Sequence, residues 1–180
     1  MRDRFDLVVA TDLNSGIGKN QTIPWRLKGD LKYFKDLTSH TEEEGKKNAC
    51  IMGRATWESI PAQFRPLPDR YNLVLTSNPD YPLPEGVFRA ASLDEALDFL
   101  AQGPVDRVFI IGGSRVYQEA FAHDRMGLIY LTEVRARFEC DRFFPEYKDF
   151  FTLISCSELQ SEGGIEYCFK VYRPNFFDEL

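Results

Sequence analysis

Five short runs of the chain are almost continuously apolar, and most are rich in β-branched or aromatic residues. Such runs are typical of strands that are buried on both faces of a sheet. They cover Phe5 to Thr11, Asn48 to Gly53, Tyr71 to Ser77, Arg107 to Gly113 and Leu128 to Val134. The pattern therefore predicts five strands in the interior of a sheet.

Four segments between these runs repeat apolar residues at the three-and-four spacing of a helix face. They span Lys28 to Thr38, Ala55 to Ile60, Ser92 to Gln102 and Ser114 to His123. Ser92 and Glu95 form a capping box at the start of the third segment. Gly103 and Pro104 end it, because neither residue favours a continuing helix.

The alternation of strands and helices predicts a largely parallel sheet covered on both faces and joined by right-handed crossovers. After Leu128 the pattern changes to consecutive strands. Phe150 to Leu159 and Ile165 to Arg173 are separated by Ser161 to Gly164, which predicts an antiparallel C-terminal hairpin at one edge. The predicted fold class is α/β, with a mixed, mostly parallel sheet and about four helices.

Length and charge limit the organisation and the partners. A chain of 180 residues with 43% hydrophobic composition suits one domain, covering 1–180. The formal charge is −6, and no run of lysine or arginine interrupts the sequence. A nucleic-acid backbone would be repelled by this charge, so nucleic acid is not the expected main partner.

Four cysteines are far apart, form no CxxC pair and have only two histidines as companions. We interpret them as reduced cysteines that serve mostly in packing, and we expect no metal site. The charged start of the chain leads directly into a short apolar strand, without a secretory signal or a membrane-spanning run. These features predict a cytoplasmic protein that does not cross a membrane.

Asp30 falls within an apolar stripe formed by Leu27, Leu31, Phe34 and Leu37. A carboxylate there is costly unless it is hydrogen-bonded or paired, and desolvation raises its pKa above about 3.9. No cationic residue lies one helical turn away on this stripe. A ligand with two N–H donors in amidine-like geometry would satisfy both carboxylate oxygens. Alternatively, Asp30 is a partly exposed residue that favours the helix dipole.

Two glycine-bearing loops connect a buried strand to a helix. Gly112 and Gly113 would let backbone N–H groups approach a pyrophosphate, and Gly53 precedes a second helix start. Arg54 and Arg115 could neutralise further negative charge. The two loops together favour a dinucleotide site, and the alternative is a pair of tight strand-to-helix turns.

Five segments occur in the order and approximate spacing found in dihydrofolate reductase, and the resemblance covers essentially the whole chain. They are GIGKNQTIPWRLKGDLKYF, IMGRATWESIP, RPLPDRYNLVLT, IIGGSRVY and FFPE. The resemblance implies an eight-stranded mixed sheet with four helices, NADPH as hydride donor and reduction of 7,8-dihydrofolate to tetrahydrofolate. It also implies binding of antifolate inhibitors. No heptad or exposed apolar stripe favours an oligomer, so a monomer is expected.

The resemblance assigns roles to matching residues. Asp30 resembles the active-site acid that binds the pterin, Thr132 the threonine that hydrogen-bonds it, and Trp25 the tryptophan that helps to hold a nearby water. Arg70 resembles the arginine that binds the α-carboxylate of the glutamate tail. The implied substrate contacts are Val8, Val9, Leu31, Phe34, Ile60, Leu67, Arg70, Ile111 and Tyr117.

The same resemblance implies a cofactor site, in which a cis peptide joins the two glycines of the IIGG segment. The implied contacts are Ala10, Ile17, Gly18, Gly53, Arg54, Ala55, Thr56, Thr76, Ser77, Gly112, Gly113, Ser114, Arg115, Val116 and Tyr117. The chain departs from many relatives at Leu31, where they have an aromatic residue. Ser77 and Ala91 stand where some relatives place arginines for the 2′-phosphate, although Arg89 lies close by in sequence.

The implied chemistry is hydride transfer to pterin C6 and protonation of N5 from a water ordered near Asp30. We expect the segment Leu13 to Trp25, with Gly16 and Gly18 as flexible points, to close over the cofactor. Two other functions stay open. The pyrimidine reductase of riboflavin synthesis shares the cofactor logic but lacks the Pro-Trp and Asp30 elements, and a non-catalytic binding protein would bind without turnover.

Overall fold

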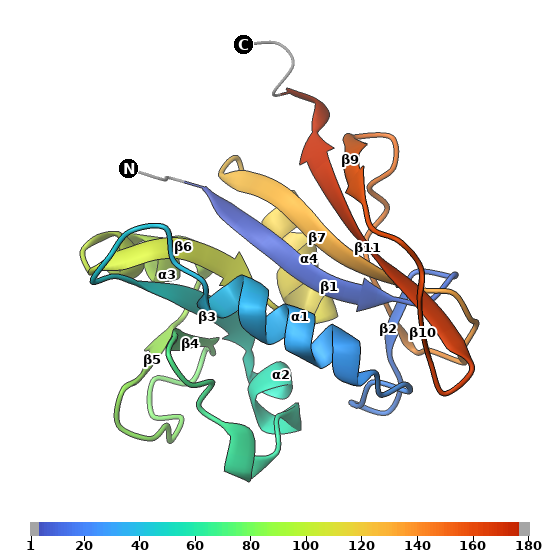
Figure 1. Cartoon of the computed structure of the whole chain (residues 1–180). Coiled ribbons are helices and arrows are strands. Elements are labelled where there is room, and N and C mark those ends of the chain that lie inside the picture. Colours follow the sequence, from blue (N-terminus) through green and yellow to red (C-terminus); the bar gives the residue numbers. More distant parts are fainter. Residues whose placement is uncertain (1–3, 177–180) are drawn as a thin grey trace.

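The computed structural model describes residues 4–176, and a mixed sheet forms its centre (Figure 1). The strands up to β7 are β1 (Phe5–Thr11), β2 (Gly16–Gly18), β3 (Lys47–Gly53), β4 (Tyr71–Leu75), β5 (Val87–Ala90), β6 (Val105–Ile110) and β7 (Met126–Val134). The remaining strands are β8 (Arg142–Phe143), β9 (Phe151–Cys156), β10 (Gln160–Glu162) and β11 (Ile165–Pro174). The helices are α1 (Lys28–Ser39), α2 (Arg54–Ser59), α3 (Leu93–Ala101) and α4 (Ser114–Phe121), with a 3-10 turn at Ala62–Phe64.

The main sheet has the strand order β10-β11-β7-β1-β6-β3-β4-β5, and β9 pairs with β11 on the same side as β10. All neighbours from β7 to β5 are parallel. The strand β11 is antiparallel to β7, β9 and β10. The prediction of a mixed, mostly parallel sheet eight strands wide, with four helices in the described part of the chain, is confirmed.

Alternate residues of each buried strand point to opposite faces of the sheet. Both faces are apolar, and helices cover both of them. Figure 1 shows α1 and α2 in front of the sheet and α4 behind it. On one face, Ala49, Ile51 and Leu73 belong to the core that includes α3 and α4. On the other face, Cys50, Met52 and Val74 pack with Trp57 of α2.

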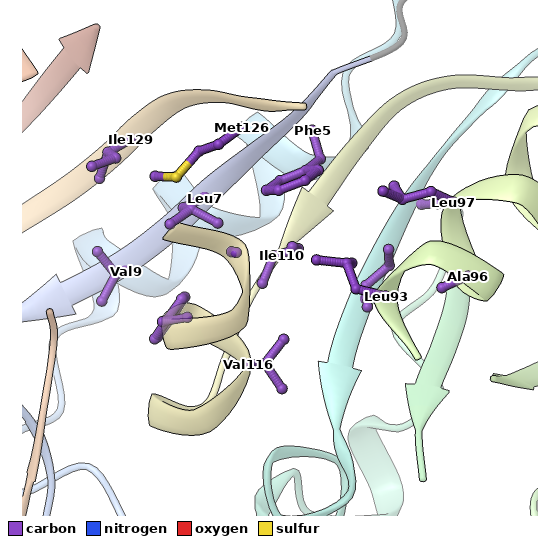
Figure 2. Close-up of a cluster of buried hydrophobic side chains, with 14 of the residues drawn as sticks. Phe5, Leu7, Val9, Leu93, Ala96, Leu97, Ile110, Val116, Met126 and Ile129 are labelled. Carbon is purple, nitrogen blue, oxygen red and sulfur yellow. The ribbon is translucent and has the colours of Figure 1, made fainter. Parts of the chain in front are cut away.

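The largest cluster of buried side chains lies between the strands of the sheet and the helices α3 and α4 (Figure 2). Phe5 and Leu7 of β1 are fully buried, and Val116 of α4 and Leu97 of α3 belong to the same cluster. Each fully buried side chain of this size contributes about 1.5–3 kcal/mol. The cluster therefore fixes α4, and with it the loop that precedes α4, against the sheet.

The predicted capping box at the start of α3 is present. The Ser92 hydroxyl accepts a hydrogen bond from the Glu95 backbone N–H at 3.1 Å. The Glu95 carboxylate reaches back to the N–H of Ala91 at 2.9 Å. One N–H group of the first turn and the N–H of the residue before the N-cap are therefore satisfied by two side chains.

The C-terminal hairpin differs in detail from the prediction. Residues 160–162 form the strand β10, so the predicted connection Ser161 to Gly164 shortens to the two glycines Gly163 and Gly164. Both glycines have positive φ, 58° and 79°, which a tight turn between antiparallel strands uses. The two predicted strands do pair, because β9 is antiparallel to β11.

Besides β10, three short strands were not predicted. The edge strand β5 has four residues, and β2 and β8 form a separate sheet of three and two residues. Runs this short give too few alternations for a pattern to be read. The boundaries of α1 to α4 differ from the predicted ones by one or two residues, within the usual fraying of helix ends.

All four cysteines are free thiols. Cys50 and Cys168 are buried, Cys140 is half-buried and Cys156 is exposed on β9, which agrees with cysteines that serve mostly in packing. Within residues 4–176, no group of three or more His, Cys, Asp or Glu side chains is placed to hold a metal ion. In the same residues, no helix has both the length and the apolar character needed to span a membrane.

Candidate active site

Asp30 lies in the first turn of α1 and contacts the neighbouring sheet. Its Oδ1 accepts a hydrogen bond of 2.7 Å from the hydroxyl of Thr132, a buried residue of β7. Burial raises the pKa of Asp30 above its usual range, and the hydrogen bond from Thr132 opposes part of that rise. In the described part of the chain, no lysine, arginine or histidine forms an ion pair with this carboxylate.

The apolar stripe around Asp30 is only partly directed at the core. Leu27 is 2% exposed, but Leu31 is 54% exposed, and Phe34 and Leu37 are half-buried. The stripe thus includes both a core residue and accessible apolar residues. A half-buried carboxylate with the exposed Leu31 beside it and the half-buried Phe34 one turn later matches a surface that an amphipathic heterocycle could cover.

Trp25 precedes α1 and is 7% exposed. Its ring packs against Phe138 at 5.2 Å between centroids, within a cluster that also contains Leu27, Val134 and Tyr167. This cluster lies under the start of α1. It fixes the segment from which Asp30 projects.

Arg70 is 7% exposed and reaches the far end of α1. Its Nη1 donates to the Thr38 hydroxyl at 2.8 Å, and its Nε donates to the Pro68 carbonyl at 2.8 Å. The guanidinium lies 5.9 Å from the centroid of the Phe34 ring. Burial lowers the pKa of Arg70, but an arginine side chain in a protein stays charged. The two hydrogen bonds use two of its five N–H donors.

The carboxyl ends of the parallel strands β3 and β6 bring the two glycine loops together. The Gly53 N–H donates to the Gly112 carbonyl at 2.8 Å, and the Gly112–Gly113 peptide is cis, as the resemblance implied. A Cβ on Gly112 would lie 3.2 Å from Thr56 Oγ1, and a Cβ on Gly53 would lie 3.1 Å from Val116. Neither α2 nor α4 has a side-chain cap at its start.

Tyr117 packs between β1 and the loop that contains Gly112. Its buried hydroxyl donates to the Val8 carbonyl at 2.6 Å and lies 3.5 Å from the position of a Cβ on Gly112. Complete burial raises the pKa of Tyr117. Because its hydroxyl is already paired with β1, Tyr117 contributes packing and orientation to the loop.

The other predicted contact residues are spread over the three buried clusters and the ends of strands. Ala10 packs against the Trp25 cluster, whereas Ile17 packs against the main core. Ile60, Leu67 and Ile111 lie at the margin of the cluster that contains Trp57. Val9 belongs to the main core, and Ala55, Thr76 and Ser77 follow the ends of β3 and β4. Gly18, at the end of β2, and Ser114, at the start of α4, are half-buried.

The two candidate phosphate arginines are accessible but paired. Arg54 forms an ion pair of 2.9 Å with Glu58 one turn later and lies over the Tyr81 ring. The Arg115 side chain is 91% exposed and lies 3.7 Å from Glu119. Exposed pairs of this spacing contribute little, so either arginine could exchange its partner for a phosphate at small cost.

Asp12 was missed by sequence reasoning. It is 2% exposed and binds the N–H groups of Asn14 and Gly16 through Oδ1 and that of Phe138 through Oδ2. It thereby ties the loop after β1 to the segment before β8. Gly16 is buried, and a Cβ there would lie 2.5 Å from Cys140 Sγ, so this glycine permits close packing of the two segments.

Comparison with known proteins decides what this arrangement is. A family model described as dihydrofolate reductase matches residues 4–174. The chain belongs to the dihydrofolate reductase family. The match includes Asp30, Thr132 and the glycine pair, so the residues that carried the resemblance lie inside it.

Individual members of the dihydrofolate reductase family agree with this match. The enzyme of Aedes albopictus is 42% identical over 179 residues, covering 94% of this chain and 96% of its own. That of Heliothis virescens is 43% identical over 179 residues, covering 94% and 97%. The solved structure of Schistosoma mansoni dihydrofolate reductase has a TM-score of 0.85 and 38% identity, and covers 95% of this chain and 98% of its own. The protein is therefore an oxidoreductase of this family.

The raised pKa of Asp30 predicts a stability effect in this member of the dihydrofolate reductase family. An acid whose pKa is raised by folding binds its proton more tightly when folded, so it lowers stability as pH rises through the folded pKa. Asp30→Asn is therefore expected to raise Tm at pH 7 and to change Tm little below the unfolded pKa. Thermal unfolding across this pH range checks the prediction, and an equal Tm at pH 7 would contradict it.

Proposed function

We propose that the protein reduces 7,8-dihydrofolate to 5,6,7,8-tetrahydrofolate, with NADPH as the hydride donor. The observation that carries the proposal is the half-buried Asp30 carboxylate, which accepts a hydrogen bond from Thr132 and has no cationic partner in residues 4–176. A pterin offers the N3 and 2-amino N–H groups side by side. These two donors match the two oxygens of a carboxylate.

The rest of the substrate would lie along α1. Leu31 and Phe34 would contact the pterin and benzoyl rings on one side, with Ile60 and Leu67 on the other. Arg70 would bind the α-carboxylate of the glutamate tail with the N–H groups that Thr38 and Pro68 leave unused. A planar guanidinium can contact both oxygens of a carboxylate, which a lysine cannot do.

In the proposed mechanism, bound NADPH supplies the hydride that reaches C6 of the pterin. Asp30 holds the pterin by its N3 and 2-amino edge and polarises the ring, while Thr132 fixes the carboxylate. The proton for N5 would come from a water ordered near Asp30, which Trp25 helps to hold. The raised pKa of Asp30 favours proton delivery through this water, because the Asp30 carboxylate can take up a proton closer to neutral pH.

The residues fit a dinucleotide in their backbone geometry. Gly53, Gly112 and Gly113 bring the two loops together without side chains of their own, which would allow a pyrophosphate to approach the main chain. The uncapped start of α4 favours negative charge, and Arg54 and Arg115 can supply counter-charge. Ala10, Ile17 and Gly18 would lie beside the nicotinamide, and Thr56, Thr76, Ser77 and Ser114 beside the phosphates and adenosine. Arg54 and Arg115 favour NADPH over NADH through the 2′-phosphate.

Gly112→Ala is expected to weaken NADPH binding by about tenfold or more. The residue has φ of 131°, and a Cβ would lie 3.2 Å from Thr56 Oγ1, so the loop must move. Fluorescence titration with NADPH measures the effect. Gly86→Ala is a matched control, because Gly86 has φ of 83° and nothing within 4 Å of the added Cβ. Equal losses of NADPH affinity in the two variants would contradict the prediction.

Incubation of the purified protein with NADPH and dihydrofolate, followed by the absorbance of the reduced cofactor, tests the function. Oxidation that depends on dihydrofolate supports it. Oxidation only with a ribityl pyrimidine would support the pyrimidine reductase instead, and tight binding without oxidation would indicate a binding protein. We further propose that 1–180 act as one domain, as a monomer in the cytoplasm, and that antifolates compete at Asp30.

A further inference from the structure

The helix that carries Asp30 begins without a cap of its own. Its N-cap residue is Leu27, whose side chain cannot accept a hydrogen bond, and no side chain within the helix replaces it. The first N–H groups of a helix have no intrahelical partners and need an acceptor from elsewhere. In this protein the acceptor comes from a distant part of the chain.

Glu162 of β10 provides this acceptor. Its Oε2 accepts a hydrogen bond from the Lys28 N–H at 2.8 Å, and its Oε1 accepts one from the Gly29 N–H at 3.2 Å. These two hydrogen bonds lower the pKa of Glu162, so the carboxylate is ionised at neutral pH. Figure 1 shows the first turn of α1 beside β10.

The same hairpin contacts α1 at two further points. Gly29 lies so close to Tyr167 of β11 that a Cβ would be 2.1 Å from the Tyr167 hydroxyl. One turn later, the Tyr33 ring stacks on Phe169 of β11, with centroids 3.9 Å apart and planes 18° apart. The buried Tyr167 cannot easily move aside, so position 29 accepts only glycine without a shift of the helix.

We propose that Glu162 is a positioning residue for Asp30. From the β10–β11 hairpin it caps α1, and it thereby holds the first turn of the helix where Asp30 can accept the hydrogen bond from Thr132. The inference rests on the proposed function and adds a residue that the reaction itself does not touch. Asp30 follows Gly29 directly. A first turn that frays would therefore move the carboxylate away from the Thr132 hydroxyl.

The cap also changes the electrostatic environment of Asp30. The positive end of a helix dipole favours an ionised carboxylate in the first turn and so lowers its pKa. Glu162 opposes this effect with its negative charge and by occupying two N–H groups. The other groups that face Asp30 are Thr132 of β7, Tyr33 of α1 and Tyr167 of β11. Fraying of the first turn would also expose Asp30 to water, and because burial is the larger cause of its raised pKa, this change outweighs the loss of the Thr132 hydrogen bond. Loss of Glu162 should therefore lower the pKa of Asp30.

The test compares Glu162→Ala and Glu162→Gln with the wild type. In Glu162→Ala the pKa of Asp30, followed by carbon NMR of labelled aspartate and assigned with Asp30→Asn, should fall by about 0.2–0.7. The kcat/KM for dihydrofolate should fall about threefold to tenfold. Glu162→Gln keeps one oxygen acceptor and should show smaller changes of the same sign. NADPH affinity should be unchanged, because its proposed site lies on other elements.

Glu166→Ala is the matched control. Glu166 lies on the same hairpin, opposite Ser161, and its exposed side chain makes no hydrogen bond or ion pair within residues 4–176. An unchanged pKa of Asp30 in both Glu162 variants, even with a lower Tm, would overturn the positioning role. The NMR titration needs no substrate. A wild type inactive toward dihydrofolate would therefore refute the proposed function separately.

Discussion

Asp30→Asn is expected to lower the turnover of dihydrofolate at neutral pH by about 10²-fold or more while NADPH binding is retained. The amide can still accept the hydrogen bond from Thr132, so the local geometry is preserved. It can bind the pterin edge with only one acceptor oxygen, and it has no negative charge with which to polarise the ring. Steady-state turnover and a fluorescence titration with NADPH measure the two quantities separately.

The matched control is Asp36→Asn on the exposed side of the same helix. Asp36 forms an exposed ion pair with Lys32, and the loss of such a pair changes stability by only a few tenths of a kcal/mol. Turnover should stay at the wild-type level in this variant. Wild-type turnover in Asp30→Asn would remove Asp30 from the mechanism.

Arg70→Lys is expected to raise the KM for dihydrofolate by about 10- to 100-fold with little change in kcat. A hydrogen bond to a charged group contributes about 1.5–3 kcal/mol, and each 1.4 kcal/mol is tenfold in affinity. Lysine also cannot keep both the Thr38 and Pro68 contacts that orient the guanidinium. Because the tail is remote from C6 and N5, the loss should appear mainly in binding.

A truncated substrate separates this effect from general damage. Dihydropteroate lacks the glutamate tail, so wild type and Arg70→Lys should use it with similar KM values. Arg137→Lys, at an exposed position, controls for the substitution itself. A rise in KM for dihydropteroate as large as that for dihydrofolate would show that Arg70 does not act through the tail.

The fold could be predicted from the sequence where a segment was long enough to show its period. The strand β1 and the four helices follow from apolar spacing and caps, with Ser92 and Glu95 as the clearest case. The strand β10 was missed because its three polar residues, before a glycine pair, have the composition of a loop.

The candidate site could be predicted only in part. Periodicity marked Asp30 as unusual, but it left two interpretations open, and only the resemblance selected Thr132 as its partner. Asp12 and Glu162 gave no local signal, since each binds backbone N–H groups of a segment more than a hundred residues away. Contacts of this kind appear only once the chain has folded.

The hydrogen bond between Arg70 and Thr38 has a consequence for ligand selection. Thr38 stands eight residues after Asp30 on α1, which corresponds to about 12 Å along the helix axis. In the proposed function, the rigid helix thus sets the spacing between the carboxylate that would bind an amino-heterocycle and the guanidinium that would bind an anion. Molecules whose two ends match this span could contact both groups at once, whereas shorter molecules could contact only one of them.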